Sequence, residues 1–192
     1  MGRRAGAVVR SLQLEAGRQD DEQAHRPAED VEGLVMTALP VRLFPVTEGK
    51  TSDECYTPAS LFDALNIRFD LDPASCPREL SAVPADRIYT VEDDGLAQPW
   101  FGRVWLNPPY SNPTPWVDRF LEHGHGIALL PASSNAKWLA RLWAEADGMA
   151  LPARHFFNLA DGDRMTTAFM TLLWAMGDDC VDAIGRVSRV RR

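Results

Sequence analysis

Short apolar runs alternate with amphipathic stretches through most of this chain. The segments at residues 104–106 and 126–130 are continuously apolar, which is the pattern of buried strands, and residues 69–72 and 88–91 fit two further short strands that are followed by turns or loops. A strong apolar run at 168–176 predicts a further strand. Weaker runs at 149–151 and 156–157 predict two more.

Helical spacing appears between these runs. Thr57 and Pro58 predict a helix start, with Thr57 as N-cap and Pro58 at the first helical position. Leu61, Phe62 and Leu65 then fall on one face. Further helices are expected at 118–122 and 137–147. Strands alternating with helices predict an α/β fold with a largely parallel sheet.

The two ends of the chain lack these periods. Residues 1–50 mix arginine, glycine, alanine and acidic residues, so we expect a flexible, disordered leader with one short helix at 8–16. Met36 is an alternative start. We place one domain at 51–178 and a basic C-terminal tail at 179–192, of which we expect residues 186–192 to be loose.

Composition narrows the class of protein. The chain has 192 residues, 45% of them hydrophobic and 24% charged, as in ordinary globular domains. It shows neither an apolar stretch long enough to cross a membrane nor a signal-peptide core, so we expect a cytoplasmic protein. The three cysteines have neither disulfide nor zinc-ligand spacing. The net charge of −7 argues against tight binding to nucleic acid without excluding it.

The most informative residues follow the run at 104–106, in the order Asn107, Pro108, Pro109 and Tyr110. The prolines fix φ and carry no N–H, so this segment is stiff and its carbonyls have no ladder partner. An amide, free carbonyls and an aromatic ring are thereby held together. That combination suits a planar amino group, which needs two acceptors and a stacking surface.

This Asn-Pro-Pro-Tyr motif resembles the catalytic motif of S-adenosylmethionine-dependent amino methyltransferases, which act on DNA adenine, RNA or protein glutamine. The flanking segments resemble the phage-type DNA N6-adenine methyltransferases in particular. The resemblance covers residues 53–176. The segments that carry it are Tyr56-Thr57-Pro58, residues 61–65, residues 69–75, residues 89–96 with Trp100, Leu130-Pro131-Ala132 and Lys137-Trp138.

The resemblance implies a compact class I (Rossmann-like) methyltransferase fold with a mostly parallel sheet. It implies methyl transfer from S-adenosyl-L-methionine to the N6 amine of adenine in double-stranded DNA, without a metal. We expect a phage or prophage enzyme that acts as a monomer in the bacterial host cytoplasm. Such an enzyme must extrude the adenine from the duplex, at a cost of a few kcal/mol.

The resemblance also assigns roles to residues. The Asn107 side-chain oxygen and the Pro108 carbonyl accept the hydrogens of the amine, next to Pro109, and Tyr110 stacks on the base. The cofactor-binding candidates are Tyr56, Thr57, Pro58, Asp72, Asp93, Asp94 and Leu96; the substrate-binding candidates are Trp116, Lys137 and Arg154.

Each role has a structural alternative. Asp72, Asp93 and Asp94 are also typical turn-capping residues, and the choice between Asp93 and Asp94 stays open. Thr57 as a plain N-cap competes with a pocket role. Lys137 and Arg154 fit solvated surface as well as phosphate contacts.

Two departures from the methyltransferase pattern keep rival functions open. No glycine-rich loop follows the first strand, where Asp72-Pro73-Ala74-Ser75 stands instead, and Ser133-Ser134 occupies a place where this family often has arginine. One rival is an amino methyltransferase acting on RNA or protein glutamine. The other is a non-catalytic module that binds nucleic acid or cofactor.

Overall fold

The computed structural model describes residues 53, 56–133, 135–153, 157–159, 164–165 and 169–192. The chain divides into two units, Met1–Pro40 and Val41–Arg192, and every described residue belongs to the second. The expected leader at 1–50 and its short helix therefore lie outside the described residues. Of the described helices, none has the length and apolar character needed to span a membrane.

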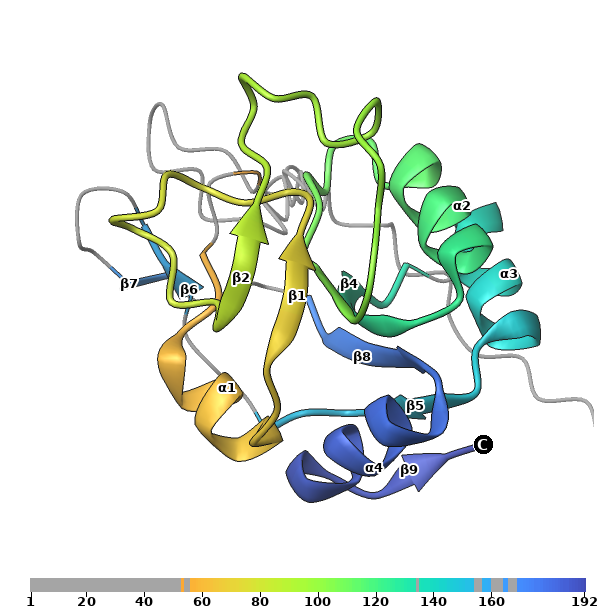
Figure 1. Ribbon diagram of the computed structural model, residues 1–192. Helices are drawn as coiled ribbons and strands as arrows, with labels where there is room; N and C mark the ends of the chain where they lie inside the picture. The colour runs from red at the N-terminus through yellow and green to blue at the C-terminus, as the bar shows by residue number, and fades with distance from the viewer. Residues whose placement is uncertain (1–52, 54–55, 134, 154–156, 160–163, 166–168) are drawn as a thin grey trace, which may run out of the picture. The chain divides into compact units, whose positions relative to one another are not determined.

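A mixed sheet of seven strands forms the centre of the second unit, in the order β2-β1-β3-β4-β8-β5-β9 (Figure 1). The strands are β1 (Phe69–Asp72), β2 (Ala85–Ile88), β3 (Val104–Leu106), β4 (Gly126–Pro131), β5 (Gly148–Ala150), β8 (Thr171–Met176) and β9 (Val190–Arg191). A separate pair joins β6 (Phe157–Asn158) to β7 (Arg164–Met165).

The expectation of a mostly parallel sheet holds for only one half. Strands β2, β1, β3 and β4 pair in parallel. The pairs β4–β8, β8–β5 and β5–β9 are antiparallel. Strand β5 runs in the same direction as β4, because both are antiparallel to the strand between them. The reversed strands β8 and β9 are what make the sheet mixed.

In the described part of the chain, four helices cover the two faces of the sheet (Figure 1). On one face, α1 (Ala59–Leu65) and α4 (Asp178–Val187) pack over Trp105, Ile127 and Leu173. On the other face, α2 (Thr114–His123) and α3 (Lys137–Glu145) pack over Val104, Leu106 and Leu130. Successive strand residues point to opposite faces, so each strand feeds both cores. The continuous apolar runs of the sequence have this physical cause.

The first crossovers contain no helix, which differs from the expected alternation of strands and helices. Residues 73–84 connect β1 to β2, and residues 89–103 connect β2 to β3, through turns alone. Both connections have hydrogen-bonded turns, with Leu80 N donating to the Pro77 carbonyl at 2.9 Å and Asp93 N to the Thr90 carbonyl at 3.1 Å. The Ser75 N–H joins the two connections by donating to the Tyr89 carbonyl at 2.9 Å. The expected strand at 88–91 has the wrong bounds. Strand β2 begins three residues earlier, at Ala85, and ends at Ile88, and residues 91–97 form a run of turns.

The expected loose tail is wrong for the last residues of the chain. Helix α4 starts at Asp178 and buries Cys180, Val181, Ala183 and Ile184 in the core. Strand β9 then pairs with β5 at the edge of the sheet. The arginines that suggested a solvated tail are exposed, with Arg186 on α4, Arg191 on β9, and Arg189 and Arg192 next to β9. In the sequence they obscure the amphipathic pattern of the helix.

Candidate active site

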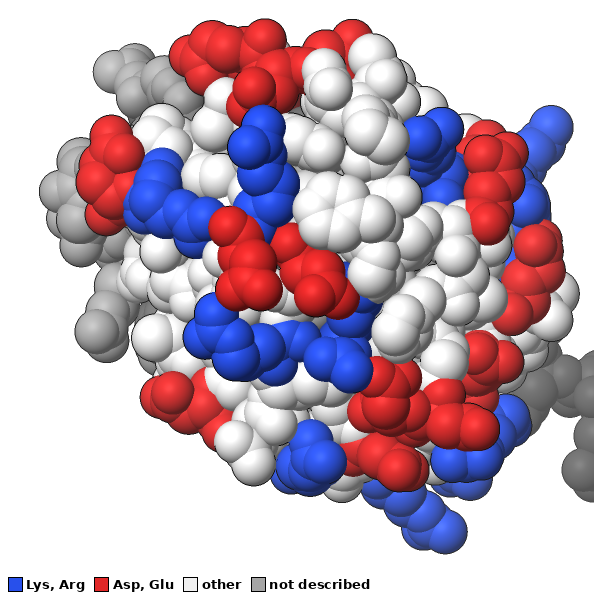
Figure 2. Space-filling model, in the orientation of Figure 1, with Lys and Arg blue, Asp and Glu red and all other residues white. Residues whose placement is uncertain are grey.

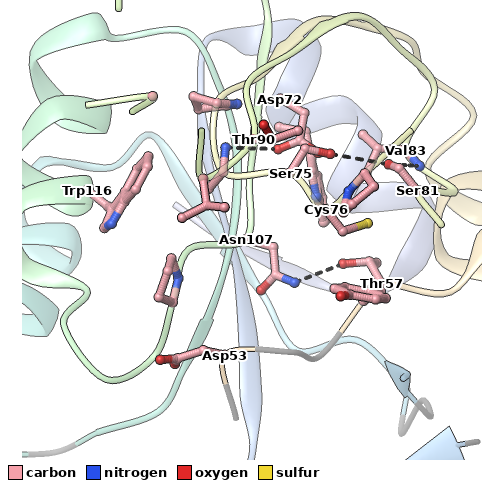
Figure 3. A pocket seen from close by; sticks show the side chains of 18 of the residues that line it. Asp53, Thr57, Asp72, Ser75, Cys76, Ser81, Val83, Thr90, Asn107 and Trp116 are labelled. Atoms are coloured by element: carbon pink, nitrogen blue, oxygen red, sulfur yellow. Dashed lines mark hydrogen bonds between the residues drawn. The ribbon is translucent and has the colours of Figure 1, made fainter. Parts of the chain in front are cut away.

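A cavity of about 550 Å³ opens beside the carboxyl ends of β1, β2 and β3. Its walls come from the segment before α1, the turn after β1, the loop after β2 and the loop after β3 (Figure 3). In parallel sheets, ligands bind where the strand order reverses. Here the chain passes from β1 to its outer neighbour β2, and then returns to β3 on the other side of β1. The cavity therefore lies at the switch point of this sheet.

Asp72 is the last residue of β1, and its side chain is only 2% exposed although it lines the cavity. Its Oδ1 accepts a hydrogen bond from the Ala74 N–H at 3.3 Å. Burial raises the pKa of Asp72 to about 7, although hydrogen bonds from Ser75 and Ala74 act in the opposite direction. A buried carboxyl group in a cavity wall is well placed to bind a cation or a hydrogen-bond donor.

Asp93 and Asp94, in the loop after β2, have different environments, although the sequence did not distinguish between them. The Asp93 carboxylate accepts hydrogen bonds from the Thr90 N–H at 2.8 Å and the Thr90 hydroxyl at 3.1 Å, so it caps a turn. These bonds lower the pKa of Asp93. Asp94 instead lines the cavity, with a left-handed backbone at φ 53°. Glu92 lines it too.

Gly95 brings this loop against the turn that replaces the missing glycine-rich loop. A Cβ atom at residue 95 would lie 1.8 Å from the Pro73 carbonyl oxygen and 2.9 Å from its carbon. The Gly95 carbonyl accepts a hydrogen bond from the Trp100 indole at 2.8 Å. The close backbone approach that a glycine provides is therefore made from the second loop, whereas the first turn has Asp72-Pro73-Ala74-Ser75.

Asn107 follows β3 directly and lines the same cavity as Asp72. Its side-chain Nδ2 donates to Thr57 Oγ1 at 3.2 Å, and its Oδ1 is buried (Figure 3). Thr57 is 4% exposed and makes no capping bond, because Pro58 is the N-cap of α1 and the helix starts at Ala59. The N-cap interpretation of Thr57 is therefore wrong.

The rest of the motif divides between the cavity and the core. Pro109 lines the cavity, and Pro108 is buried beside it. The Tyr110 hydroxyl donates to the Leu129 carbonyl at 3.3 Å, and its ring contacts Phe169 edge-on at 5.7 Å between centroids. Tyr110 is half-buried and is not among the residues that line the cavity.

The remaining candidates are distributed unevenly. Trp116 on α2 lines the cavity and stacks on Trp100 at 6.4 Å between ring centroids, and Tyr56 also lines it. Pro58 and Leu96 are half-buried outside the cavity wall, and Lys137 is exposed at the start of α3. Arg154 lies outside the described residues.

Sequence reasoning missed several cavity residues. Asp53 and Glu92 line it, as do Cys76 and Ser81 from the turn after β1. Ser75 lies near Ser81, with 3.5 Å between their hydroxyl oxygens. The position of Ser75 and Cys76 directly after the strand that ends at Asp72 was the available signal for these two residues. Asp53 had no local signal, since its place depends on a contact with a residue far along the chain.

Charge in the cavity wall has a single sign. The lining residues of the described part of the chain include Asp53, Asp72, Glu92 and Asp94, and no lysine or arginine. Carboxylates that share a concave wall focus a negative potential into it. The cavity therefore favours a ligand that carries positive charge.

Together these features define an α/β protein with an acidic ligand cavity and an amide-bearing loop at the carboxyl edge of its sheet. Residues 46–163 match the DNA N-6-adenine-methyltransferase (Dam) family, and the chain belongs to this family.

Two phage proteins of the same description are similar to this chain. A DNA N-6-adenine-methyltransferase of Haemophilus phage HP1 is 39% identical over 79 residues, which cover 38% of this chain and 44% of the phage protein. One from Escherichia phage T1 is 33% identical over 95 residues, covering 42% and 38% respectively. The match thus spans less than half the length of either relative.

Proposed function

We propose that this chain transfers a methyl group from S-adenosylmethionine to the N6 amine of adenine in double-stranded DNA. Family membership and the names of the two phage relatives support the reaction class. The observation that carries the proposal is that Asp72 and Asn107, from the ends of adjacent strands, line one cavity. A cofactor group and an acceptor amine can then meet inside it.

The sheet supports a compact class I, Rossmann-like methyltransferase fold. Its parallel half has a switch point between β1 and β3, and its other half inserts a reversed strand, β8, between β4 and β5. The turn-rich crossovers after β1 and β2 make this version compact.

The residues present fit S-adenosylmethionine. The cavity volume lies in the range of small-molecule sites. The cofactor carries a sulfonium and an ammonium group, and the carboxylates of the cavity wall are complementary in charge to both. We assign Asp72 to the ammonium group and Asp94, in preference to the turn-capping Asp93, to the polar groups of the nucleoside. Bound there, the cofactor supplies an activated methyl group.

The acceptor side needs two hydrogen-bond acceptors for one amine. We assign these to Asn107 Oδ1 and the Pro108 carbonyl. Pro109 has no N–H, so it does not compete with the amine for these acceptors. Accepting both hydrogens shifts electron density onto the adenine nitrogen as it becomes tetrahedral. The amide dipole is oriented before the substrate arrives, so catalysis comes from positioning and fixed dipoles. Trp116 supplies an aromatic surface in the cavity wall, and Tyr110 supports the loop through its contacts with Leu129 and Phe169.

The test is a methylation assay with labelled cofactor and three acceptors, namely duplex DNA, RNA and a protein mixture. We expect N6-methyladenine in DNA from the wild type, and none from Asn107→Ala, which still binds cofactor in calorimetry. Labelling of RNA or protein alone would replace DNA as the substrate. Cofactor binding without transfer to any acceptor would overturn the enzyme assignment in favour of a binding module.

A further inference from the structure

The loop that carries the proposed chemistry, residues 107–111, contacts a segment far away in the sequence. We name Asp53, Tyr56 and Thr57 the lead-in segment, because they lie within six residues before the start of α1. This segment forms part of the same cavity wall as Asn107 and Pro109 (Figure 3).

The lead-in segment holds this loop at both of its ends. At the first end, Thr57 Oγ1 accepts a hydrogen bond from Asn107 Nδ2 at 3.2 Å. At the second end, Asp53 accepts two hydrogen bonds from Ser111, from its N–H at 3.0 Å and from its hydroxyl at 2.7 Å. Hydrogen bonds to a carboxylate are stronger than those between neutral groups.

The loop depends on such outside contacts because of its own sequence. Pro108 and Pro109 have no N–H, so the middle of the loop is unable to donate backbone hydrogen bonds to the rest of the protein. The Asn107 amide and the Ser111 N–H are donors on either side of the two prolines, and both are directed to the lead-in segment.

Two residues of the lead-in segment are themselves fixed. Tyr56 exchanges two backbone hydrogen bonds with Asn158 of β6, each at 2.9 Å. Thr57 is buried, and α1 begins two residues later with Leu61, Phe62 and Leu65 in the core. The contact with Thr57 therefore restrains the loop instead of moving with it.

We propose that Asp53 and Thr57 are positioning residues, which set the place of the Asn107 amide and the Pro108 carbonyl without touching the reacting atoms. This inference rests on the proposed function. A displacement of about 1 Å in a reacting group can reduce the rate about 100-fold, so the loss of either contact affects the methyl-transfer step. The competing role is a direct contact of Asp53 with substrate, since Asp53 also lines the cavity.

A double-mutant cycle separates the two roles of Asp53. We expect Asp53→Ala to lower the single-turnover methylation rate about 10- to 100-fold at saturating cofactor, with cofactor affinity unchanged. Ser111→Ala removes only the hydroxyl. We expect a smaller loss from it in the wild type and no further loss in Asp53→Ala, because the hydroxyl acts through Asp53. Losses that add fully, or a rate unchanged in Asp53→Ala, would overturn the proposal.

Two matched controls complete the cycle. Asp63→Ala removes an exposed carboxylate from α1, and we expect no effect on the rate. Thr57→Val is isosteric and lacks the hydroxyl, whereas Thr57→Ser keeps it. We therefore expect a slow Thr57→Val enzyme and a Thr57→Ser enzyme close to wild type. Equal rates for these two variants would remove Thr57 from the proposal.

A second measurement is independent of turnover. Hydrogen exchange of the peptide that contains residues 107–112 should be faster in Asp53→Ala than in Asp63→Ala, because the Ser111 amide loses its acceptor. Equal exchange in the two variants would overturn the proposal even if the wild type methylated nothing. A wild type without activity, combined with faster exchange in Asp53→Ala, would refute the proposed function and leave the positioning contact standing.

Discussion

At the scale of single residues, Asp72 combines two properties that folding alone does not favour. It is buried, and its pKa is raised to about 7 by that burial. An ionised carboxylate is costly in such a place, and the charge of Arg78 offsets only a small part of that cost. The folded protein therefore retains a proton on Asp72 that the unfolded chain releases at its ordinary pKa of 3.8. A buried carboxyl group with a shifted pKa is typical of a ligand site, where a cationic group of the ligand stabilises the ionised form.

The first prediction concerns pH. Because the pKa of Asp72 is raised in the folded state, its contribution to stability is complete below about pH 4 and is lost as pH rises through about 7. The loss amounts to at most roughly 4 kcal/mol. Asp72→Asn removes it, so we expect this variant to melt at a higher temperature than the wild type at about pH 8 and at an equal one at about pH 4.

Thermal melts at the two pH values test this, with Asp63→Asn on the exposed face of α1 as the control. Calorimetry of the same Asp72→Asn protein should show weaker cofactor binding, since the ammonium group loses its counter-charge. Wild-type cofactor affinity should increase between about pH 6 and about pH 8, as Asp72 ionises. A melting temperature of Asp72→Asn below that of the wild type at high pH would contradict the burial argument.

The second prediction concerns Gly95. A Cβ there would overlap the Pro73 carbonyl, so backbone must move, and we expect Gly95→Ala to cost about 1–3 kcal/mol of unfolding free energy and to weaken cofactor binding. Gly185 on α4 is the matched control, since its added Cβ meets only Val190 Cγ2 at 3.5 Å. We expect Gly185→Ala to be neutral or stabilising by up to about 1 kcal/mol. Urea unfolding of both variants measures the difference, and equal effects would refute the close-approach argument.

Local chemistry made some cavity residues predictable from the sequence and left others hidden. Asp72 ends β1, and Asn107 and Pro109 lie within three residues of the end of β3, so the strand pattern placed all three at one edge of the sheet. Asp93 and Asp94 differ by the handedness of one backbone turn, which adjacent acids in a sequence do not reveal. Asp53 depends on Ser111, 58 residues away, and a pairing of that kind has no local pattern.

At the scale of elements, the last helix corrects the domain boundary that the sequence suggested. Helix α4 packs beside α1 in the core that covers Trp105 and Ile127. The Arg103 guanidinium at the start of β3 pairs with Asp179 at the start of α4, and His125 before β4 lies 3.1 Å from the same carboxylate. Burial opposes ionisation of Asp179, but hydrogen bonds from Arg103 and His125 outweigh it and lower the pKa of Asp179 to about 2.

The third prediction tests whether α4 is part of the cooperative fold. Ile184 is fully buried, so Ile184→Ala should lower the free energy of unfolding by about 2–5 kcal/mol in a single transition. Asp182 on the same helix is exposed, and Asp182→Ala should change it by less than about 0.5 kcal/mol. Urea titrations followed by tryptophan fluorescence measure both. If Ile184→Ala left the transition unchanged, α4 would be an appendage, as the basic sequence suggested.

Elements were predicted best where one physical signal dominated. The strands at residues 69–72 and 104–106 have the predicted bounds. The run at 104–106 is continuously apolar, and residues 69–72 alternate apolar and acidic residues before a proline, so each has few alternatives to a strand. The helix α2 was predicted only in part, at 118–122. It starts at Thr114, where prolines obscured the beginning of the pattern. The antiparallel strands β8 and β9 changed the sheet type, since strand direction is decided by tertiary connections and not by local sequence.

At the scale of the whole molecule, the distribution of charge has consequences for both proposed ligands. The chain carries a net charge of −7, and on the face drawn in Figure 2 acidic and basic side chains lie side by side. Several charged side chains of the described residues pair, such as Arg68 with Asp86 at 2.8 Å. Surface pairs of this kind contribute little to stability and partly neutralise one another. The acids of the cavity wall have no such neutralisation among the cavity-lining residues described.

The last prediction follows from that wall. S-adenosylmethionine has a net charge of about +1 near neutral pH, whereas its demethylated product S-adenosylhomocysteine is close to neutral. Since salt screens exposed charges beyond about 10 Å at 0.1 M, raising the salt from about 50 mM to about 500 mM should weaken binding of the cofactor more than binding of the product. Calorimetry with each ligand at both salt concentrations measures this.

Glu92→Gln and Asp94→Asn should reduce the difference between the ligands, and Asp182→Asn, on the distant surface of α4, should leave it unchanged. An identical salt dependence for cofactor and product would show that shape, and not the acidic wall, selects the methylated form. If the acidic wall does select it, transfer of the methyl group removes the charge that holds the ligand, and the product leaves because the reaction has occurred.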